Sequence, residues 1–162
     1  MKKLLATLLV ATILTCLGCR QQKEYRTDVT CETITQSVCE ELSEEEGYLP
    51  FGEDHVRVSF EDTTRYTDKS LVYSARSENI DEIGIFRAES DADVDELRRL
   101  CEQYVTNLRE DMRAFVESYA PREAQKLDRA EVKSFGRYVV YTVLSEEDRA
   151  EAYEEIEMLL GK

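Results

Sequence analysis

Apolar residues recur at every third or fourth position in three segments of the chain, the spacing of one helix face. The longest segment, 90–119, carries on one stripe Val94, Leu97, Cys101, Tyr104, Leu108, Met112, Phe115 and Tyr119. Ser90 and Asp93 form a capping box at its start, and Pro121 ends it because proline has no backbone N–H to donate. A helix of roughly 28 residues would be about 42 Å long, so we expect one end to project or bend. A further helical turn is expected within 122–129.

The same spacing predicts two shorter helices near the ends of the domain. The apolar face of the first consists of Cys31, Ile34, Val38 and Leu42. We expect this helix to begin after an N-cap at Asp28 and to stop at Gly47, with 47–54 following as a loop. The second helix begins with a capping box of Ser145 and Asp148. Its inner face carries Tyr153, Ile156 and Leu160.

Five further segments have the apolar character of strands: 55–60, 71–76, 83–88, 131–135 and 138–144. The first alternates, with Val56, Val58 and Phe60 on one side. The polar residues 77–81 predict a turn between the second and third strands. Gly136 supplies the tight turn of a hairpin that joins the last two strands.

The order of these elements is helix, strands, long helix, strands, helix. Short connections favour hairpins, so we expect an α+β fold with an antiparallel sheet of about four to five strands. Segment 138–144 is apolar on both faces and is expected in the interior of the sheet. The long amphipathic helix and the N- and C-terminal helices are expected to pack mainly on one face.

The first residues differ from the rest of the chain. Lys2 and Lys3 precede an uncharged, mostly apolar run over 4–17. As a helix this run reaches only about 21 Å, short of the roughly 30 Å hydrocarbon core of a membrane. A removable export signal is therefore favoured over a permanent membrane span. A buried core helix is disfavoured because no polar face interrupts the run.

The end of this run resembles a bacterial lipoprotein signal, in which a small residue precedes the cysteine that becomes lipid-modified. Leu17-Gly18-Cys19 fits the last three positions, while Cys16 stands where the pattern usually has an aliphatic residue. The resemblance implies cleavage before Cys19 and a thioether-linked diacylglycerol on its sulfur. Two acyl chains suffice for stable membrane anchoring. An ordinary secretory signal is the alternative.

Composition and charge limit the partners. The chain has 162 residues, 42% of them hydrophobic, which fits one folded domain. Its 35 Asp+Glu against 21 Lys+Arg give a net charge of −14. A nucleic-acid partner is excluded because its binding surface would be basic. Repulsion from anionic headgroups leaves the lipid on Cys19 to hold the protein at the membrane.

We expect three parts: a signal peptide over 1–18, a polar tether over 19–27 and a single α+β domain over 28–162. Removal of the 18 signal residues leaves 144 of the 162. Lys2 and Lys3 are lost but no acid is, so the net charge changes from −14 to −16. Such a chain is too small for the two-lobed solute receptor of an importer.

The second half of the chain is similar to the domain-of-unknown-function 4358 proteins, small exported lipoproteins of clostridial and related Gram-positive bacteria. The resemblance is carried by Asp81–Arg87, Ser118–Glu123 and Val132–Tyr141, and extends roughly over 78–160. It implies the order strand, long helix, Tyr-Ala-Pro break, hairpin, helix, and an exported location. It implies no activity and no catalytic residue.

One acidic cluster has the spacing of a calcium site. Asp91, Asp93, Asp95 and Glu102 match ligand positions of an EF-hand loop, but Glu96 stands where that loop needs glycine. Acids are also favoured at a helix start, where they interact with the helix dipole. Helix-start electrostatics is the favoured interpretation, and calcium binding is the alternative.

The cysteines that follow the signal are expected to be mainly buried small hydrophobes. Cys31 and Cys39, on one helix, lie about 12 Å apart along its axis and cannot form a disulfide. Cys101 on the long helix can face either of them. A cysteine nucleophile would need His55, the only histidine, and no pattern links His55 to a thiol.

We therefore expect a non-enzymatic binding or accessory module at the extracellular face of the membrane, with an envelope protein as its partner and no cofactor. No serine-hydrolase, phosphate-loop or His-rich metal pattern occurs in the sequence. The alternatives are an envelope hydrolase with paired carboxylates and a cation-binding domain. A flat apolar patch rimmed with acids would favour the binding module. A buried pair of convergent acids in a deep pocket would favour the hydrolase.

Overall fold

The computed structural model describes residues 23–43, 45–60 and 64–162. The expected signal peptide and Cys19 therefore lie outside the described residues. Within those ranges, no helix combines the length and the hydrophobicity that a membrane span requires.

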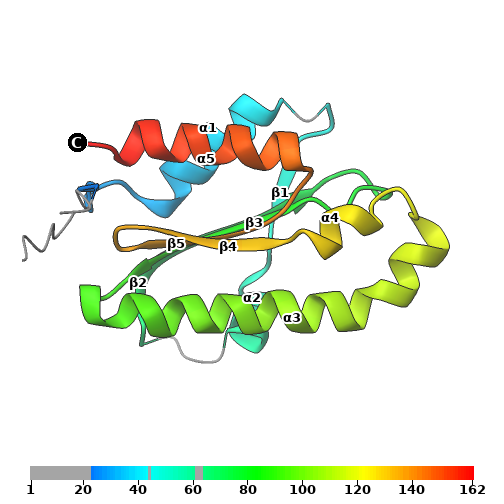
Figure 1. The fold of residues 1–162 in the computed structure, drawn as a ribbon, viewed down its shortest axis with the longest axis horizontal. Helices are drawn as coiled ribbons and strands as arrows, with labels where there is room; N and C mark the ends of the chain where they lie inside the picture. The colour runs from blue at the N-terminus through cyan, green and yellow to red at the C-terminus, as the bar shows by residue number, and fades with distance from the viewer. Residues whose placement is uncertain (1–22, 44, 61–63) are drawn as a thin grey trace, which may run out of the picture.

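The domain is built on one antiparallel sheet with the strand order β1-β2-β3-β5-β4 (Figure 1). Its strands are β1 Tyr48–Pro50, β2 Tyr66–Ser74, β3 Glu82–Ala88, β4 Glu131–Phe135 and β5 Tyr138–Val143. All neighbouring strands are antiparallel. The predicted α+β class, the antiparallel sheet and the hairpin around Gly136, whose φ is 59°, are confirmed.

The helices cover both faces of the sheet, which corrects the expected packing mainly on one face (Figure 1). Helices α1 Cys31–Leu42 and α5 Glu146–Leu160 lie on one face. The other face carries α2 Glu53–Ser59 and α3 Val94–Tyr119, with the short helices η1 Asp91–Asp93 and α4 Ala124–Asp128 at the two ends of α3. All six residues of β5 are buried, so both faces of this strand need a cover.

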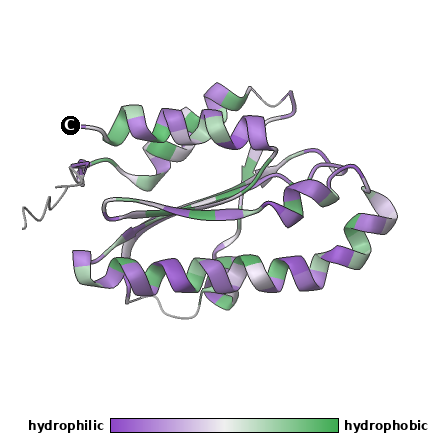
Figure 2. Ribbon diagram, in the orientation of Figure 1, coloured by the Kyte–Doolittle hydropathy of each residue, from purple (hydrophilic) through white to green (hydrophobic). Residues whose placement is uncertain are grey.

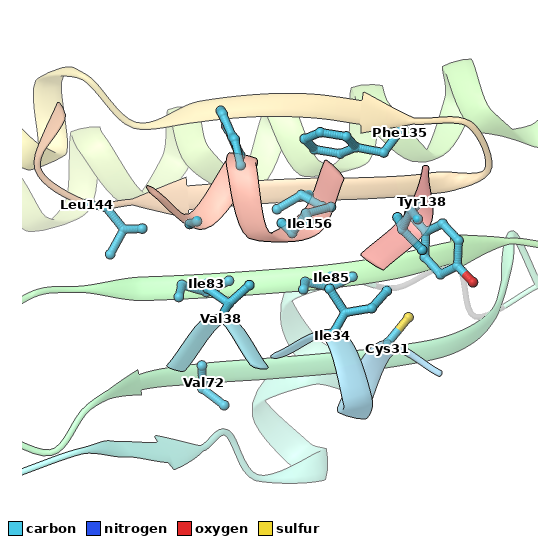
Figure 3. Packing of buried hydrophobic residues seen from close by; sticks show 14 residues of the cluster. Cys31, Ile34, Val38, Val72, Ile83, Ile85, Phe135, Tyr138, Leu144 and Ile156 are labelled. Carbon is cyan, nitrogen blue, oxygen red and sulfur yellow. The ribbon is translucent and has the colours of Figure 1, made fainter. Parts of the chain in front are cut away.

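Two hydrophobic cores result, separated by the sheet. Side chains of a strand alternate between faces, and β3 sends Ile83 and Ile85 to the core beneath α1 and α5. Figure 3 shows these residues packed against Ile34 and Ile156. Phe86 points to the core beneath α3. Apolar and polar residues alternate along the ribbons of α3 and α5 in Figure 2, as amphipathic helices require.

The segment 55–59 is helical and Phe60 is the C-cap, which corrects the strand predicted over 55–60. Val56 and Phe60 are buried and lie four residues apart, a spacing that suits a helix, whereas Val58 is 72% exposed. Strand β1 lies inside the predicted loop 47–54. It has only three residues and ends at a proline, so it carries no alternating pattern.

Helix α1 begins and ends elsewhere than expected. Its N-cap is Thr30 rather than Asp28, with the Thr30 hydroxyl accepting from the backbone N–H of Thr33 at 3.1 Å. It ends at Leu42, before the expected stop at Gly47, with Ser43 as its C-cap in the left-handed conformation. In α5 the backbone N–H of Asp148 donates to Ser145 at 3.1 Å, which confirms Ser145 as N-cap.

The sequence pattern predicted the end of α3 correctly, but not the hydrogen bond at its start. At its start, Ser90 donates to the carboxylate of Asp93 at 2.6 Å instead of capping a backbone N–H. The helix ends at Tyr119, just before Pro121, as predicted. Its last turns curve toward α4 (Figure 1), in line with the expected bend.

The two buried cysteines lie on opposite faces of the sheet. Cys31 belongs to the core beneath α1 and α5, and Cys101 to the core beneath α3. The sheet separates them, so they cannot form a disulfide. Cys31, Cys39 and Cys101 are all free thiols. Cys39 is half-buried on α1 and is separated from Cys101 in the same way.

Gly84 on β3 leaves the space that the ring of Tyr141 on β5 occupies. A Cβ atom at Gly84 would lie 2.0 Å from Tyr141 Cε1. We predict that Gly84→Ala lowers the free energy of unfolding by about 3 kcal/mol, the upper part of the range for overpacked cores. Urea unfolding of the purified protein measures this change.

Gly52→Ala is the matched control. Gly52 has a φ of −67°, and a Cβ atom at this position would meet no other atom within 4 Å, so the substitution should cost less than about 1 kcal/mol. Equal losses in the two variants would contradict the role assigned to Tyr141.

Candidate functional site

An open cavity of about 230 Å³ lies between α3 and the sheet, where the β2–β3 turn approaches α4. Its apolar wall consists of Leu108, Met112, Phe115, Val116 and Leu127. The turn and the start of β3 add Ser77, Asn79, Asp81 and Glu82. Phe51 and Tyr73 bring two aromatic rings to the same cavity. These residues define the candidate site, which is called the α3 cavity below.

The α3 cavity follows from a difference in length between the helix and the sheet beneath it. Helix α3 has 26 residues, about 39 Å, whereas β3 has seven, about 24 Å. The apolar stripe of α3 therefore continues past the end of the strands. Phe115 and Tyr119 on this overhang are 51% and 76% exposed.

Two acids line the cavity, Asp81 and Glu82, and among the described residues Glu82 has no cationic partner. It is the first residue of β3, is 6% exposed and points to the α3 side of the sheet. Its Oε1 accepts hydrogen bonds from the hydroxyls of Tyr104, at 2.6 Å, and Tyr141, at 2.5 Å. Burial raises the pKa of the Glu82 carboxyl, although both hydroxyls act to lower it. Within the described ranges, no lysine or arginine forms an ion pair with Glu82.

Asp81, in contrast, is neutralised by α4. Lys126 Nζ lies 2.7 Å from Asp81 Oδ1, and Asn79 Nδ2 donates to Oδ2 at 3.0 Å. Burial raises the pKa of Asp81, and its bond to Lys126 opposes that rise. Burial alone would lower the pKa of Lys126, but its bonds to Asp81 and Glu123 raise it overall. This network fixes the β2–β3 turn against α4 and closes one side of the cavity.

A chain of polar contacts links Glu82 to the surface. The Tyr104 hydroxyl that donates to Glu82 also lies 3.4 Å from Nε2 of His55. His55 is exposed on α2 and stacks on Phe51 with ring centroids 4.2 Å apart. Burial lowers the pKa of His55. His55 is thus an aromatic neighbour of the cavity.

The three thiols are not poised for nucleophilic chemistry. Burial raises the pKa of Cys31 and of Cys101 far above the ordinary value, and that of Cys39 to about 11. A thiol acts as a nucleophile in its ionised form, and a raised pKa disfavours that form. None of the three is therefore an activated cysteine.

The four calcium candidates do not converge. Asp91 lies exposed in η1, and Asp93 accepts from Ser90 and pairs with Arg65 at 3.4 Å. Asp95 and Glu102 lie on α3 and flank Arg98, at 3.9 and 2.7 Å. In the described part of the chain, no three His, Cys, Asp or Glu side chains form a group that could hold a metal ion. Asp91, Asp93 and Asp95 lie at the helix start, and arginines pair with Asp93, Asp95 and Glu102.

Sequence reasoning did not single out the α3 cavity. Asp81 and Glu82 entered only as part of a family motif, and the signal that points to them is local: two acids directly precede an apolar strand. The partners of Glu82 lie 22 and 59 residues away along the chain. No short motif contains all three residues.

The family model described as "Domain of unknown function (DUF4358)" matches residues 62–144, just over half of the chain. The chain belongs to this family. The DUF4358 match begins earlier than the resemblance seen in the sequence and ends before α5. It includes every cavity residue named above except Phe51. No curated protein and no solved structure matches the chain.

The raised pKa of Glu82 predicts a specific pH dependence of stability. In the folded chain, Glu82 keeps its proton at pH values above 4.5, its ordinary pKa. The stability that this group contributes is therefore fully present below pH 4.5, and it is lost as the pH rises through the raised pKa of the folded state. We predict that Glu82→Gln flattens the fall of unfolding free energy over this window. Urea unfolding measured from pH 4 upward, in steps of about one pH unit, checks it.

Glu110→Gln is the control for this measurement, because Glu110 lies on α3 with its side chain exposed to solvent. It should leave the pH profile of stability unchanged. A Glu82→Gln profile parallel to that of the parent chain would contradict the prediction.

Proposed function

We propose that the protein is a lipid-anchored, non-enzymatic binding module at the extracellular face of the cell membrane. The observation that supports binding is the α3 cavity, which is open to solvent and has mainly apolar walls. Sites for drug-sized ligands usually measure about 300–1,000 Å³, and this cavity measures about 230 Å³. It therefore suits a small molecule or a single side chain of a partner.

The position of the N-terminal segment supports an orientation in which the α3 cavity faces away from the membrane. Tyr25 pairs with Gly161 in an isolated bridge, and the backbone N–H of Arg26 donates to Leu160 at 2.8 Å. Part of the expected tether 19–27 is thus bonded to the domain. The chain enters at the end opposite α4 (Figure 1). A lipid on Cys19 would leave the α3 cavity at the end remote from the membrane.

The arrangement of acids bears on the alternative of a carboxylate hydrolase. Two buried acids, Asp81 and Glu82, line one cavity, which is the observation in favour of a hydrolase. However, Asp81 is paired with Lys126, and Glu82 Oε1 already accepts two tyrosine hydroxyls. A carboxylate hydrolase needs two acids that both exchange protons or charge with the substrate, and the ion pair with Lys126 withholds Asp81 from that role. The binding module remains the function that we propose.

The anchor is tested at Cys19. We predict that the protein made in a Gram-positive host enters the detergent phase on phase partitioning, and that Cys19→Ala moves it to the aqueous phase because no acyl chain is attached. Cys39→Ala, which removes a thiol on α1, is the matched control and should leave the partitioning unchanged. A parent chain that stays in the aqueous phase would show that it is not a lipoprotein.

The cavity is tested with a neutral apolar probe. We predict that 1-hexanol shifts the methyl NMR signals of Leu108, Met112 and Val116, and that Ser77→Trp reduces these shifts at least about threefold by filling the entrance. Ser77 is exposed in the β2–β3 turn, so the fold should tolerate the change. Ser118→Trp, exposed on α3 but outside the cavity wall, is the control. Absence of any shift at these methyl groups would contradict the proposed binding function.

A further inference from the structure

We propose that the α3 cavity binds a small protonated amine, with its short apolar chain against α3 and its ammonium group at Glu82. This inference rests on the proposed binding function and adds the chemical class of the ligand. Three features of the cavity carry it: a buried carboxylate without a cation, two aromatic rings beside it, and an apolar wall of limited size.

The first feature is the unbalanced charge of Glu82. Burying a carboxylate without a cationic partner is costly, and a cation that enters the cavity removes that cost. The two tyrosine hydroxyls share Oε1, and a carboxylate offers about four lone-pair sites. Acceptor capacity is therefore left for an ammonium group, which has three N–H donors.

Of the two acids that line the cavity, Glu82 is the one that would bind the cation. Asp81 is already bonded to Lys126, which also lies 2.8 Å from Glu123. Lys126 is thus held by two acids of its own surroundings and does not serve Glu82. One cationic group beside Glu82 would therefore balance the charge of the cavity. An anionic ligand would instead lie beside the carboxyl groups of Asp81 and Glu82.

The second feature is the pair of rings. Phe51 and Tyr73 lie with centroids 4.8 Å apart at an angle of 48°, and both line the cavity together with Glu82. Aromatic faces attract a cation within about 6 Å of the ring centre. Carboxylate and aromatic rings together are the groups that recognise an alkylammonium ion.

The third feature is the wall formed by Leu108, Met112 and Leu127. It would bury the hydrocarbon chain of the ligand, and burial of apolar surface favours binding. The volume of about 230 Å³ limits the ligand to a short chain. Ammonium alone would leave this wall empty, so an amine with a chain is expected to bind better than methylamine.

The experiment compares hexylamine, 1-hexanol and hexanoate, which share a six-carbon chain and differ in charge, together with methylamine. Binding to the full-length chain is followed by NMR at the cavity methyl groups. We expect hexylamine to bind at least about tenfold more tightly than 1-hexanol, a difference of about 1.4 kcal/mol. Hexanoate and methylamine should bind more weakly than hexylamine.

Variants identify the receptor of the charge. Glu82→Gln should reduce the affinity for hexylamine to that for 1-hexanol and leave 1-hexanol binding unchanged. Glu110→Gln, which removes one exposed charge elsewhere on α3, should change neither. Should Glu82→Gln fail to fold, Tyr73→Leu serves instead, because it keeps an apolar side chain but removes a ring. It should weaken hexylamine binding more than 1-hexanol binding.

The outcomes separate this inference from the function on which it rests. Equal affinities for hexylamine and 1-hexanol, or hexylamine binding that survives Glu82→Gln, overturn the amine site and leave the binding module standing. Binding of none of the six-carbon probes overturns both. A preference for hexanoate would show that the charge of the cavity has been assigned the wrong sign.

Discussion

The fold depends on one buried contact group, in which Glu82 accepts hydrogen bonds from Tyr104 of α3 and Tyr141 of β5. The ring of Tyr141 occupies the space that Gly84 leaves empty on the neighbouring strand. Hydrogen bonds thereby hold helix α3 to β3 and β5 within a core that is otherwise apolar. Since buried polar groups are costly unless they are bonded, this group specifies one relative position of α3 and the sheet.

Under the proposed binding function, the same group would couple stability to binding. The carboxylate that positions α3 also lines the α3 cavity, so its desolvation weakens the fold at the pH where it ionises. A native site often keeps such a cost because the group is needed for recognition. Asp81, one residue earlier, avoids the cost through its ion pair with Lys126.

The elements that the sequence predicted well are those with long, regular patterns. The stripe of α3, the hairpin of β4 and β5 and the capping serine of α5 all have local signals. The strand prediction for segment 55–60 was wrong because Val56 and Phe60, four residues apart, fit the alternation of a strand and one face of a helix equally well. The α3 cavity could not be predicted, because it results from a helix that is longer than its sheet and from tyrosines far from Glu82 in the chain.

The bridge between Tyr25 and Gly161 has a mechanical consequence. Tyr25 also packs edge-on against Phe135 at 6.0 Å and against the Gly136 turn. A pulling force on the N-terminus would therefore be shared between the β4–β5 hairpin and the end of α5. The bonds at this end would be strained first, and the opposite end, with α4 and the β2–β3 turn, would keep its shape under tension.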